Sequence, residues 1–359
     1  MGRRPGARTF LSAATSDKRR SENSPNPFCQ SRAAADRDVR APIILACDMG
    51  GTRIKLGLVR GGKVLQRTVI PAESDKGLGP RLPVVAQAFR ELLKASGTKL
   101  SACGGVSISY PSLVDPASGR ILAAHGKYLD GPGIDLRGWA KRELGLPLAI
   151  ENDARMALIG EWQYGAGRGC DNLAIITLGT GLGTSAIIEG QVLRGRHNQA
   201  GCFGGHLTVR YGGRRCNCGN LGCAEAEAST AFLTALAKQR VDYGSSRLAE
   251  QPILDFKTVF ALAEEGDLCA KALRDQSLLV WGSLAVNLIH AYDCVRLILG
   301  GGIMASAKII LPAIRAHVEK YAHTPWGKVR VVPSQLGDDA ALLAGEWLVR
   351  EQTARMERR

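Results

Sequence analysis

The chain has 359 residues, of which 45% are hydrophobic and 22% charged, a composition typical of a globular protein with two domains or lobes. Its net charge of +14 invites a nucleic-acid hypothesis, but the charge is spread without a basic helix, apart from an excess of Lys and Arg in residues 1–40. No apolar run is long enough to span a bilayer. The composition therefore argues against both a nucleic-acid partner and a membrane partner.

Residues 1–40 are rich in Arg, Ser and Ala and lack apolar periodicity, so they cannot bury enough surface to offset the entropy cost of ordering. We predict a disordered extension here, or a start site placed too far upstream, and an organelle transit peptide is the alternative. Ten cysteines suit a secreted disulfide scaffold only in a much shorter chain. We therefore expect reduced thiols and a cytoplasmic protein.

The ordered part of the chain is expected to begin at Ile43, with a buried strand that runs into the sequence DMGGT at 48–52. More strands follow around a Gly61-Gly62 hairpin and later in this half of the chain, separated by helices. The predicted strands are Ile43–Cys47, Ile54–Val59, Lys63–Ile70, Val106–Ser109 and Pro147–Ile150, and the predicted helices are Leu82–Ala95 and a segment that follows Asp153 and ends at Tyr164.

The second half of the chain repeats the order strand, glycine turn, strand and hairpin. Its predicted elements are the strands Leu173–Leu178, Thr184–Glu189 and Val295–Leu299 and the helices Ala226–Lys238, Phe256–Glu265, Leu268–Tyr292 and Asp338–Val349. Two α/β units that each open with a glycine turn favour an enzyme that holds a nucleotide between two lobes. We expect a small lobe of residues 41–151 plus 338–359 and a large lobe of residues 152–337.

Both glycine turns follow a buried strand, and without Cβ atoms their backbone N–H groups can approach phosphate oxygens. The predicted phosphate-binding residues are Asp48, Gly50, Gly51 and Thr52 in the first turn and Gly179, Thr180 and Gly181 in the second. Asp48 is also a candidate ligand for Mg²⁺, directly or through water. The alternative is two ordinary hairpin turns, since neither segment matches a Walker A loop or a protein-kinase glycine loop.

The segment 206–223 contains the most specific pattern in the chain. The side chains of His206, Cys216, Cys218 and Cys223 offer one imidazole and three thiolates, a closed set suited to tetrahedral zinc. A closed set leaves no position for a catalytic water, so the predicted zinc is structural. The alternatives are four unrelated residues or a redox pair of cysteines.

Asp153 is the candidate catalytic residue, because it follows a strand and opens a helix, and ligands bind at the carboxyl ends of strands in α/β sheets. A carboxylate in this position can accept a proton from a hydroxyl nucleophile, and phosphoryl transfer needs little more than such a base, Mg²⁺ and positioning. The alternative is that Asn152 or Asp153 only caps the helix.

In combination, these segments resemble the ROK family of sugar kinases and sugar-responsive repressors over about residues 43–345. The motifs that carry the resemblance are DMGGT at 48–52, END at 151–153, LGTGLG at 178–183, GH at 205–206, CNCGNLGCAE at 216–225, LGGG at 299–302 and GDDAALL at 337–343. The resemblance implies an α/β fold of the actin-like ATPase (ribonuclease H-like) type, with the sugar in a cleft between two lobes.

The resemblance further implies an ATP:sugar phosphotransferase in which Asp153 takes the proton of the sugar hydroxyl that attacks the γ-phosphate. Gly301 and Gly302 would lie against the adenosine. The residues implied to bind the sugar are Asn152, His206, Glu225 and, in segments that line the sugar pocket of relatives, Ser112 and Lys127. ATP with Mg²⁺ and a structural Zn²⁺ would be the cofactors, and by analogy a homodimer is expected.

One departure from the family pattern concerns the sugar. Family kinases usually have Glu three residues before the zinc-binding histidine, whereas residues 200–206 here read AGCFGGH, with one extra residue and Cys202 or Phe203 in that place. A hexose or an N-acylhexosamine is the expected substrate class, with the particular sugar left open. The alternatives are a sugar-binding protein without kinase activity and a sugar-responsive transcriptional regulator, which would need a winged helix-turn-helix that residues 1–40 do not offer.

Overall fold

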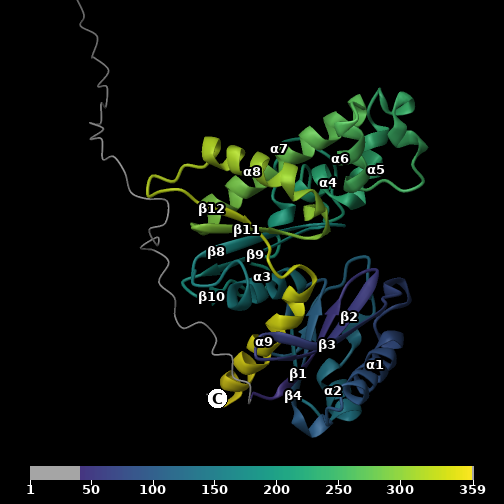
Figure 1. Cartoon of the computed structure of the whole chain (residues 1–359), viewed down its shortest axis with the longest axis vertical. Helices are drawn as coiled ribbons and strands as arrows, with labels where there is room; N and C mark the ends of the chain where they lie inside the picture. Colours follow the sequence, from purple (N-terminus) through teal and green to yellow (C-terminus); the bar gives the residue numbers. More distant parts are fainter. Residues whose placement is uncertain (1–40, 358–359) are drawn as a thin grey trace, which may run out of the picture.

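The computed structural model describes residues 41–357, so the expectation for residues 1–40 lies outside the described residues. Its framework is two five-stranded sheets, one above the other in Figure 1. The first has the order β3-β2-β1-β4-β7, with β1 Ile43–Met49, β2 Arg53–Arg60, β3 Lys63–Pro71, β4 Cys103–Tyr110 and β7 Leu148–Asn152. The second has the order β10-β9-β8-β11-β12, with β8 Leu173–Leu178, β9 Leu182–Ile188, β10 Gln191–Val192, β11 Arg296–Gly300 and β12 Arg330–Pro333.

Helices cover both faces of each sheet. They are α1 Leu82–Ala95, α2 Leu136–Leu144, α3 Asp153–Tyr164, α4 Ala224–Ala228, α5 Thr230–Lys238, α6 Phe256–Glu264, α7 Leu268–Tyr292, α8 Ala307–Tyr321 and α9 Ala340–Glu357. Figure 1 shows α1 and α2 on the outer side of the first sheet, α6, α7 and α8 on the outer side of the second, and α3 and α9 between the sheets. Among residues 41–357, no helix is both long and apolar enough to cross a bilayer.

The central strands are almost entirely buried because helices cover both of their faces. In β1, every residue except Asp48 is buried, without the alternation of a half-exposed strand. The parallel register pairs Asp48 with Ser109 of β4, and Ser109 with Glu151 of β7. The carboxyl ends of β1, β4 and β7 therefore meet at one edge of the first sheet, where the first glycine turn and Asp153 follow.

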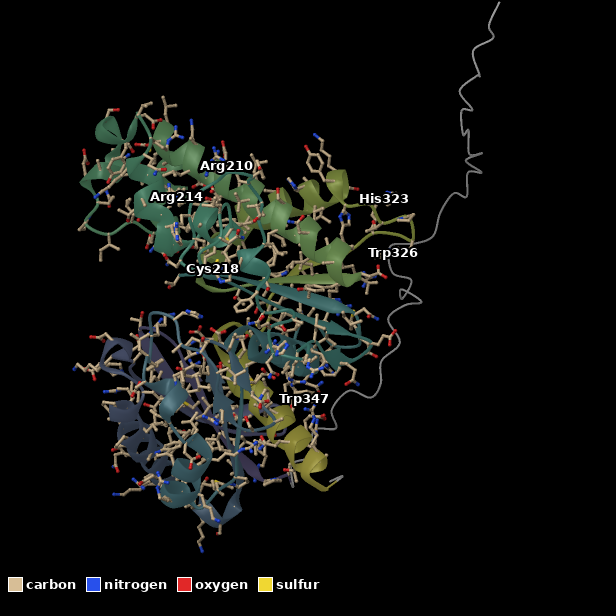
Figure 2. All side chains as sticks on the ribbon, turned by 180° about the vertical axis from the view of Figure 1, so that it is seen from behind. Arg210, Arg214, Cys218, His323, Trp326 and Trp347 are labelled. Atoms are coloured by element: carbon tan, nitrogen blue, oxygen red, sulfur yellow. The ribbon has the colours of Figure 1, made fainter. Side chains whose placement is uncertain are left out.

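α3 and α9 pack against each other between the two sheets, and glycines allow the close approach. A Cβ atom on Gly160 of α3 would overlap the carbonyl group of Ala340, and one on Gly345 of α9 would overlap the Ser107 hydroxyl in the first sheet. Nearby, the rings of Trp162 and Trp347 meet edge to face with centroids 5.9 Å apart (Figure 2 labels Trp347). These contacts join the end of the chain to the helix that begins at Asp153.

Most predicted elements are present, but one predicted helix is divided. The segment Ala226–Lys238 forms two helices, α4 and α5, because Ser229 between them is extended, with φ −108° and ψ 162°. The break lets the first N–H groups of α5 bond to the second glycine turn, so a tertiary contact overrides the local preference for helix. The sequence analysis also missed α2 and β12, and the proposed lobe boundaries stay a prediction.

The β2–β3 hairpin turn depends on a carboxylate from the far end of the chain. Glu346 of α9 accepts the N–H groups of Gly61 (2.6 Å) and Gly62 (2.7 Å) and the hydroxyl of Tyr164 (3.0 Å). Because an amide has only one acceptor oxygen and no charge, Glu346→Gln should lower the free energy of unfolding by about 1–3 kcal/mol.

Chemical denaturation of the full chain measures this change. Glu351→Gln is the matched control on the same helix, because Glu351 makes only an exposed pair with Arg355, and its effect should stay below about 0.5 kcal/mol. Equal unfolding free energies for the two variants would contradict the role given to Glu346.

Candidate functional site

The first glycine turn, residues 50–52, has its carbonyl groups bound by donors from the surrounding protein. The donors are the Tyr128 hydroxyl to the Gly50 oxygen (2.8 Å), the Ser74 hydroxyl to the Gly51 oxygen (2.8 Å) and the Ala72 N–H to the Thr52 oxygen (3.0 Å). Within residues 41–357, the N–H groups of Gly51 and Thr52 have no partner. Fixed carbonyls and unpartnered amides are the arrangement that binds phosphate oxygens.

The second glycine turn is arranged in the same way by α5. Its carbonyl oxygens at Gly179 and Thr180 accept the N–H groups of Thr230 (3.2 Å) and Ala231 (3.0 Å), and the Gly179 N–H bonds to the Gly181 oxygen (3.1 Å). In the part of the chain that the structure describes, the N–H groups of Thr180 and Gly181 are without partners. Each sheet thus ends in a turn with two available amides.

Asp48 stands beside the first turn, and its two oxygens already have neighbours. One accepts the Ser109 hydroxyl at 2.7 Å, and the other lies 3.5 Å from the Lys55 ammonium. Lys55 also pairs with Asp338 at 2.8 Å, so Asp48 is only partly neutralised. These surroundings favour a contact between Asp48 and Mg²⁺ through a water molecule. An Mg²⁺ ion bound directly to the carboxylate would have to displace the Lys55 ammonium.

Gly301 and Gly302 follow β11 next to the second turn. β11 is parallel to β8, with Gly300 opposite Thr177, so both strands end at the same edge. Gly301 has φ +90°, and a Cβ atom there would overlap the backbone of Leu178. A Cβ on Gly302 would meet nothing within 4 Å, which leaves room for a ligand at this position.

Asp153 opens α3, but the neighbouring Asn152 makes the fuller cap. The Asn152 side-chain oxygen accepts the N–H groups of Ala154 (3.1 Å) and Arg155 (3.2 Å). Asp153 uses Oδ1 for the Ala154 N–H (2.8 Å) and the Asn152 amide (3.0 Å), while Oδ2 has no partner among the described residues. One oxygen of Asp153 is therefore free for a substrate.

The electrostatic surroundings of Asp153 suit a base that works near neutral pH. Burial raises the pKa of Asp153 to about 6, the N–H group of Ala154 and the Lys127 ammonium lower it, and the Asp48 carboxylate raises it. Asp153 is only partly open to solvent, at the end of β7. A carboxyl group with this pKa is mostly ionised at pH 7 and remains a better proton acceptor than an ordinary aspartate.

The predicted sugar-binding residues Asn152 and Ser112 differ in what they have to offer. Both amide hydrogens of Asn152 have acceptors, the Ser112 carbonyl (3.2 Å) and Asp153, so Asn152 is committed to positioning its neighbours. The Ser112 hydroxyl is buried and has no hydrogen-bond partner in the described residues. An unsatisfied buried hydroxyl at this place is available to a ligand.

A buried charge cluster below Asp153 was missed by the sequence analysis. Glu151 and Arg155, both 0% exposed, form an ion pair at 3.2 Å, and the second Glu151 oxygen accepts Arg194 Nε at 2.7 Å. Arg155 also donates to the carbonyls of Leu193, Asn198 and Ala200. A charged i,i+4 pair is usually an exposed helix pair, so its spacing alone did not indicate burial.

The same cluster contacts the segment before His206, where the resemblance leads us to expect a Glu. Cys202 Sγ lies 3.5 Å from Arg155 Nη2, so the cysteine faces the cluster. The Phe203 ring lies 5.6 Å from the His206 ring, centroid to centroid. The carboxylate expected in relatives is thus replaced by a thiol beside the guanidinium and an aromatic ring beside the predicted zinc ligand.

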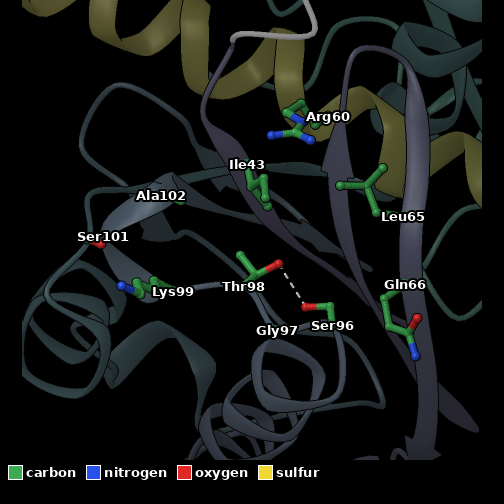
Figure 3. Close-up of a pocket in the computed structure, with 10 residues that line it drawn as sticks. All are labelled: Ile43, Arg60, Leu65, Gln66, Ser96, Gly97, Thr98, Lys99, Ser101 and Ala102. Carbon is green, nitrogen blue, oxygen red and sulfur yellow. Dashed lines mark hydrogen bonds between the residues drawn. The ribbon is translucent and has the colours of Figure 1, made fainter.

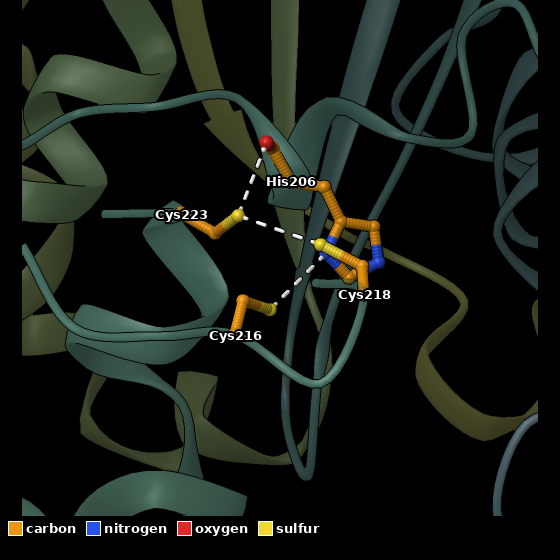
Figure 4. Close-up of side chains that lie close together, drawn as sticks. All are labelled: His206, Cys216, Cys218 and Cys223. Atoms are coloured by element: carbon orange, nitrogen blue, oxygen red, sulfur yellow. Dashed lines mark hydrogen bonds between the residues drawn. The ribbon is translucent and has the colours of Figure 1, made fainter. Parts of the chain in front are cut away.

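The four predicted metal ligands come together in space, as Figure 4 shows. Their ligand atoms all lie within 4.8 Å of one another, with Cys218 and Cys223 sulfurs 3.7 Å apart and His206 Nδ1 3.6 Å from the Cys216 sulfur. Four ligands about 2.0–2.3 Å from a tetrahedral zinc would be separated by similar distances, so the residues fit the ion. The glycines in the loop permit its path, since Gly219 and Gly222 have φ +94° and +68°.

Glu225, predicted to bind sugar, lies against the second glycine turn. Its Oε2 accepts the Leu182 N–H at 2.9 Å, and a Cβ atom on Gly181 would lie 2.5 Å from the same oxygen. Glu225 is the second residue of α4, two positions after the last cysteine of the loop. The metal loop, this carboxylate and the second turn are therefore one connected unit.

A separate hollow of about 760 Å³ lies at the opposite end of the first sheet (Figure 3). It is lined by Ile43 at the start of β1, by Arg60 and by the exposed segment 96–99, and by none of the predicted site residues. Ligands of parallel α/β sheets bind at the carboxyl ends of the strands, and this hollow is at the amino end of β1. We therefore place the functional site at the glycine turns.

Comparison with known proteins identifies the relatives of the chain. Glucokinase of Halalkalibacterium halodurans is 30% identical over 320 residues, or 87% of this chain and 96% of that protein. Glucokinase of Thermotoga maritima is 31% identical over 316 residues, covering 86% and 98%. A solved ROK family glucokinase from Streptomyces griseus, in complex with glucose and AMPPNP, has a TM-score of 0.71 and 27% identity, covering 86% of this chain and 99% of that one.

These likenesses confirm the expected actin-like ATPase fold, with its two α/β sheets and the helices between them. Residues 44–352 match the family model described as the ROK family. This range is close to residues 43–345, which contain the motifs that resemble the family. The protein belongs to the ROK family.

Proposed function

We infer that the protein is an ATP-dependent sugar kinase whose catalytic base is Asp153. The observation that carries this inference is the unpartnered Oδ2 of Asp153 at the edge of the first sheet where the first glycine turn also lies. The next residue, Ala154, packs against β9, the strand that follows the second turn. A Cβ atom added to Gly183 of this strand would lie 3.2 Å from the Ala154 Cβ. Similarity to glucokinases supports the assignment.

The reaction follows from this arrangement. The amides of Gly51, Thr52, Thr180 and Gly181 bind phosphate oxygens of the nucleotide. Asp153 accepts the proton of the attacking sugar hydroxyl, the sugar oxygen bonds to the γ-phosphorus, and the bond from that phosphorus to the bridging oxygen breaks to release ADP. Mg²⁺, bound with the nucleotide and held by Asp48 through water, would supply charge neutralisation at the phosphates.

For the sugar, we propose a hexose or an N-acylhexosamine that contacts Ser112, His206 and Glu225. The Ser112 hydroxyl lacks a partner in the described residues, and the His206 ring turns Nδ1 toward the cysteines, which leaves Nε2 for the ligand. The Phe203 ring beside His206 supplies an apolar surface where the resemblance leads us to expect a carboxylate. Because this site has one hydrogen-bond acceptor fewer, it should prefer a sugar that lacks a hydroxyl at the corresponding position or carries an acyl group there.

We also propose a structural Zn²⁺ in the cluster of His206 and the three loop cysteines, a reducing cytoplasmic location and a homodimer. The nine cysteines within residues 41–357 are free thiols. The dimer rests on analogy with the family alone.

The function is tested by measuring ADP release from ATP with glucose, mannose, fructose, allose, N-acetylglucosamine and N-acetylmannosamine. We expect turnover with at least one of these sugars and no shift of promoter DNA. No turnover with any sugar, together with measurable sugar binding, would favour a binding protein. A specific DNA shift would favour a regulator.

Asp153→Asn should lower kcat by about 10²–10⁴-fold with sugar binding nearly unchanged, because it removes the proton acceptor and keeps the shape of the side chain. Since burial opposes ionisation of this carboxyl, the variant should melt at the same temperature as the wild type or higher at pH 8. Full turnover by this folded variant would show that another group acts as the base.

The kcat/KM of the wild type should fall as the pH is lowered through about 6, by roughly tenfold per unit below that value, because only the ionised Asp153 accepts a proton. Two charges face this group and act in opposite directions: Asp48 raises the pKa of Asp153 and Lys127 lowers it. The measurement is a kcat/KM profile at saturating ATP from about pH 5 to 8. Constant activity down to pH 5 would contradict a pKa raised by burial.

Cys218→Ser tests the zinc site, because Cys218 is exposed and its substitution should be nearly neutral in the absence of a metal. With zinc bound, the variant should melt several degrees lower than the wild type and lose its response to a chelator, since structural zinc couples to folding. Cys103→Ser, in the first sheet, is the control and should keep the chelator response. Identical melting and chelator curves for Cys218→Ser and the wild type would argue against the ion.

A further inference from the structure

Lys127 lies in a loop that is bound to the first glycine turn. The neighbouring Tyr128 is fully buried, donates its hydroxyl to the Gly50 carbonyl at 2.8 Å and donates its N–H to the Ser74 carbonyl at 2.8 Å. Tyr128 has φ +49°, a left-handed conformation that a bulky residue adopts only when its surroundings require it. The backbone at Lys127 is therefore held against the turn.

The side chain of Lys127 crosses directly over Gly51. A Cβ atom added to Gly51 would lie 2.9 Å from the Lys127 ammonium nitrogen and 3.0 Å from its Cδ. A larger residue at position 51 would displace the end of the lysine side chain. The ammonium group thus stands above the same turn whose Gly51 and Thr52 amides lack partners in the described chain.

Lys127 has no carboxylate partner at ion-pair distance within the part of the chain that the structure describes. Lys127 is half-buried, and no carboxylate oxygen of residues 41–357 lies within 4.0 Å of its nitrogen. The other lysine near this turn, Lys55, is paired with both Asp48 and Asp338. A partly desolvated cation without a counterion, next to available amides, is a place for an anionic oxygen.

The Lys127 ammonium is also close enough to Asp153 to lower the pKa of that carboxyl. It thereby opposes burial and Asp48, which both raise this pKa. The group that passes from the nucleotide to the sugar must lie between the phosphate turns and the base. Lys127 borders this space from the side of the first turn. Its position therefore corresponds to the transferred phosphoryl group more closely than to a sugar hydroxyl.

We propose that the Lys127 ammonium binds the γ-phosphoryl group and neutralises the charge on its oxygens during transfer to the sugar. The proposal rests on the proposed kinase function and adds a catalytic residue to it. Lys127 donates hydrogen bonds only: the hydroxyl proton goes to Asp153, the sugar oxygen bonds to phosphorus, and ADP leaves with the bridging oxygen. A fixed cation at the site of developing charge accelerates phosphoryl transfer.

The test compares the full-length wild type with Lys127→Met, which keeps the length of the side chain without its charge, and Lys127→Arg, which keeps the charge. Affinities for AMPPNP and ADP are measured by calorimetry, and kcat and KM are measured with the best sugar of the panel. Lys127→Met should weaken AMPPNP binding by about tenfold or more, leave ADP binding within about twofold, and lower kcat by roughly 10²-fold or more. Lys127→Arg should recover part of both losses.

Lys76→Met is the matched control, because it removes a lysine of the same region that pairs at the surface with Glu73. It should leave all four quantities unchanged. Equal effects of Lys127→Met on AMPPNP and ADP, no effect on either, or a loss confined to sugar KM would overturn the proposal. If the wild type phosphorylates no sugar, the kinase function fails, yet loss of the AMPPNP preference in Lys127→Met still supports γ-phosphate binding.

Discussion

The buried ion pair between Glu151 and Arg155 is the interaction on which the site depends. Both side chains are fully buried, and removing Glu151 would leave Arg155 as a buried charge without a carboxylate, which costs about 3–5 kcal/mol. Glu151 is the penultimate residue of β7 in the first sheet, and Arg155 is in the first turn of α3. Asn152 and Asp153 stand between them, so the position of the candidate base is set by the pair on either side of it.

Arg155 also connects the ion pair to the segment that follows β10 of the second sheet. Its guanidinium holds the carbonyls of Asn198 and Ala200, in the segment that leads from β10 toward His206 and the metal loop. The base and the segment predicted to contact sugar are therefore coupled through one buried group. Cys202, one of the two residues where the resemblance leads us to expect a carboxylate, turns toward the same guanidinium.

The two glycine turns and Lys127 complete the electrostatics of the candidate site. In each turn, hydrogen-bond donors bind the carbonyl oxygens, which leaves two neighbouring amide N–H groups for phosphate. The donors include the side chains of Ser74 and Tyr128 in the first turn and the first amides of α5 in the second. Lys127 adds a positive charge to the first turn only. The transferred phosphoryl group is expected on that side, near Asp153. The Asp153 carboxylate is opposite in charge to Lys127, and burial raises its pKa.

The sequence alone determined the elements whose signals are local. The apolar runs and glycine turns predicted most strands, the spacing of cysteines around His206 predicted ligands that prove to lie within 4.8 Å of one another, and the ordered motifs indicated the family. Local signals suffice there because strand burial, turn geometry and a short chelating loop depend on neighbouring residues. The roles of these residues in catalysis stay predictions.

Only the tertiary structure decided which charges are buried and which are left without a partner. Arg155 and Lys127 are both ordinary basic residues in the sequence, yet one is enclosed by carbonyls and Glu151 while the other stands unpaired over Gly51. The break at Ser229 likewise depends on a turn about fifty residues earlier in the chain. The physical reason is that burial and pairing arise from contacts between distant segments, which periodicity and spacing along the chain do not encode.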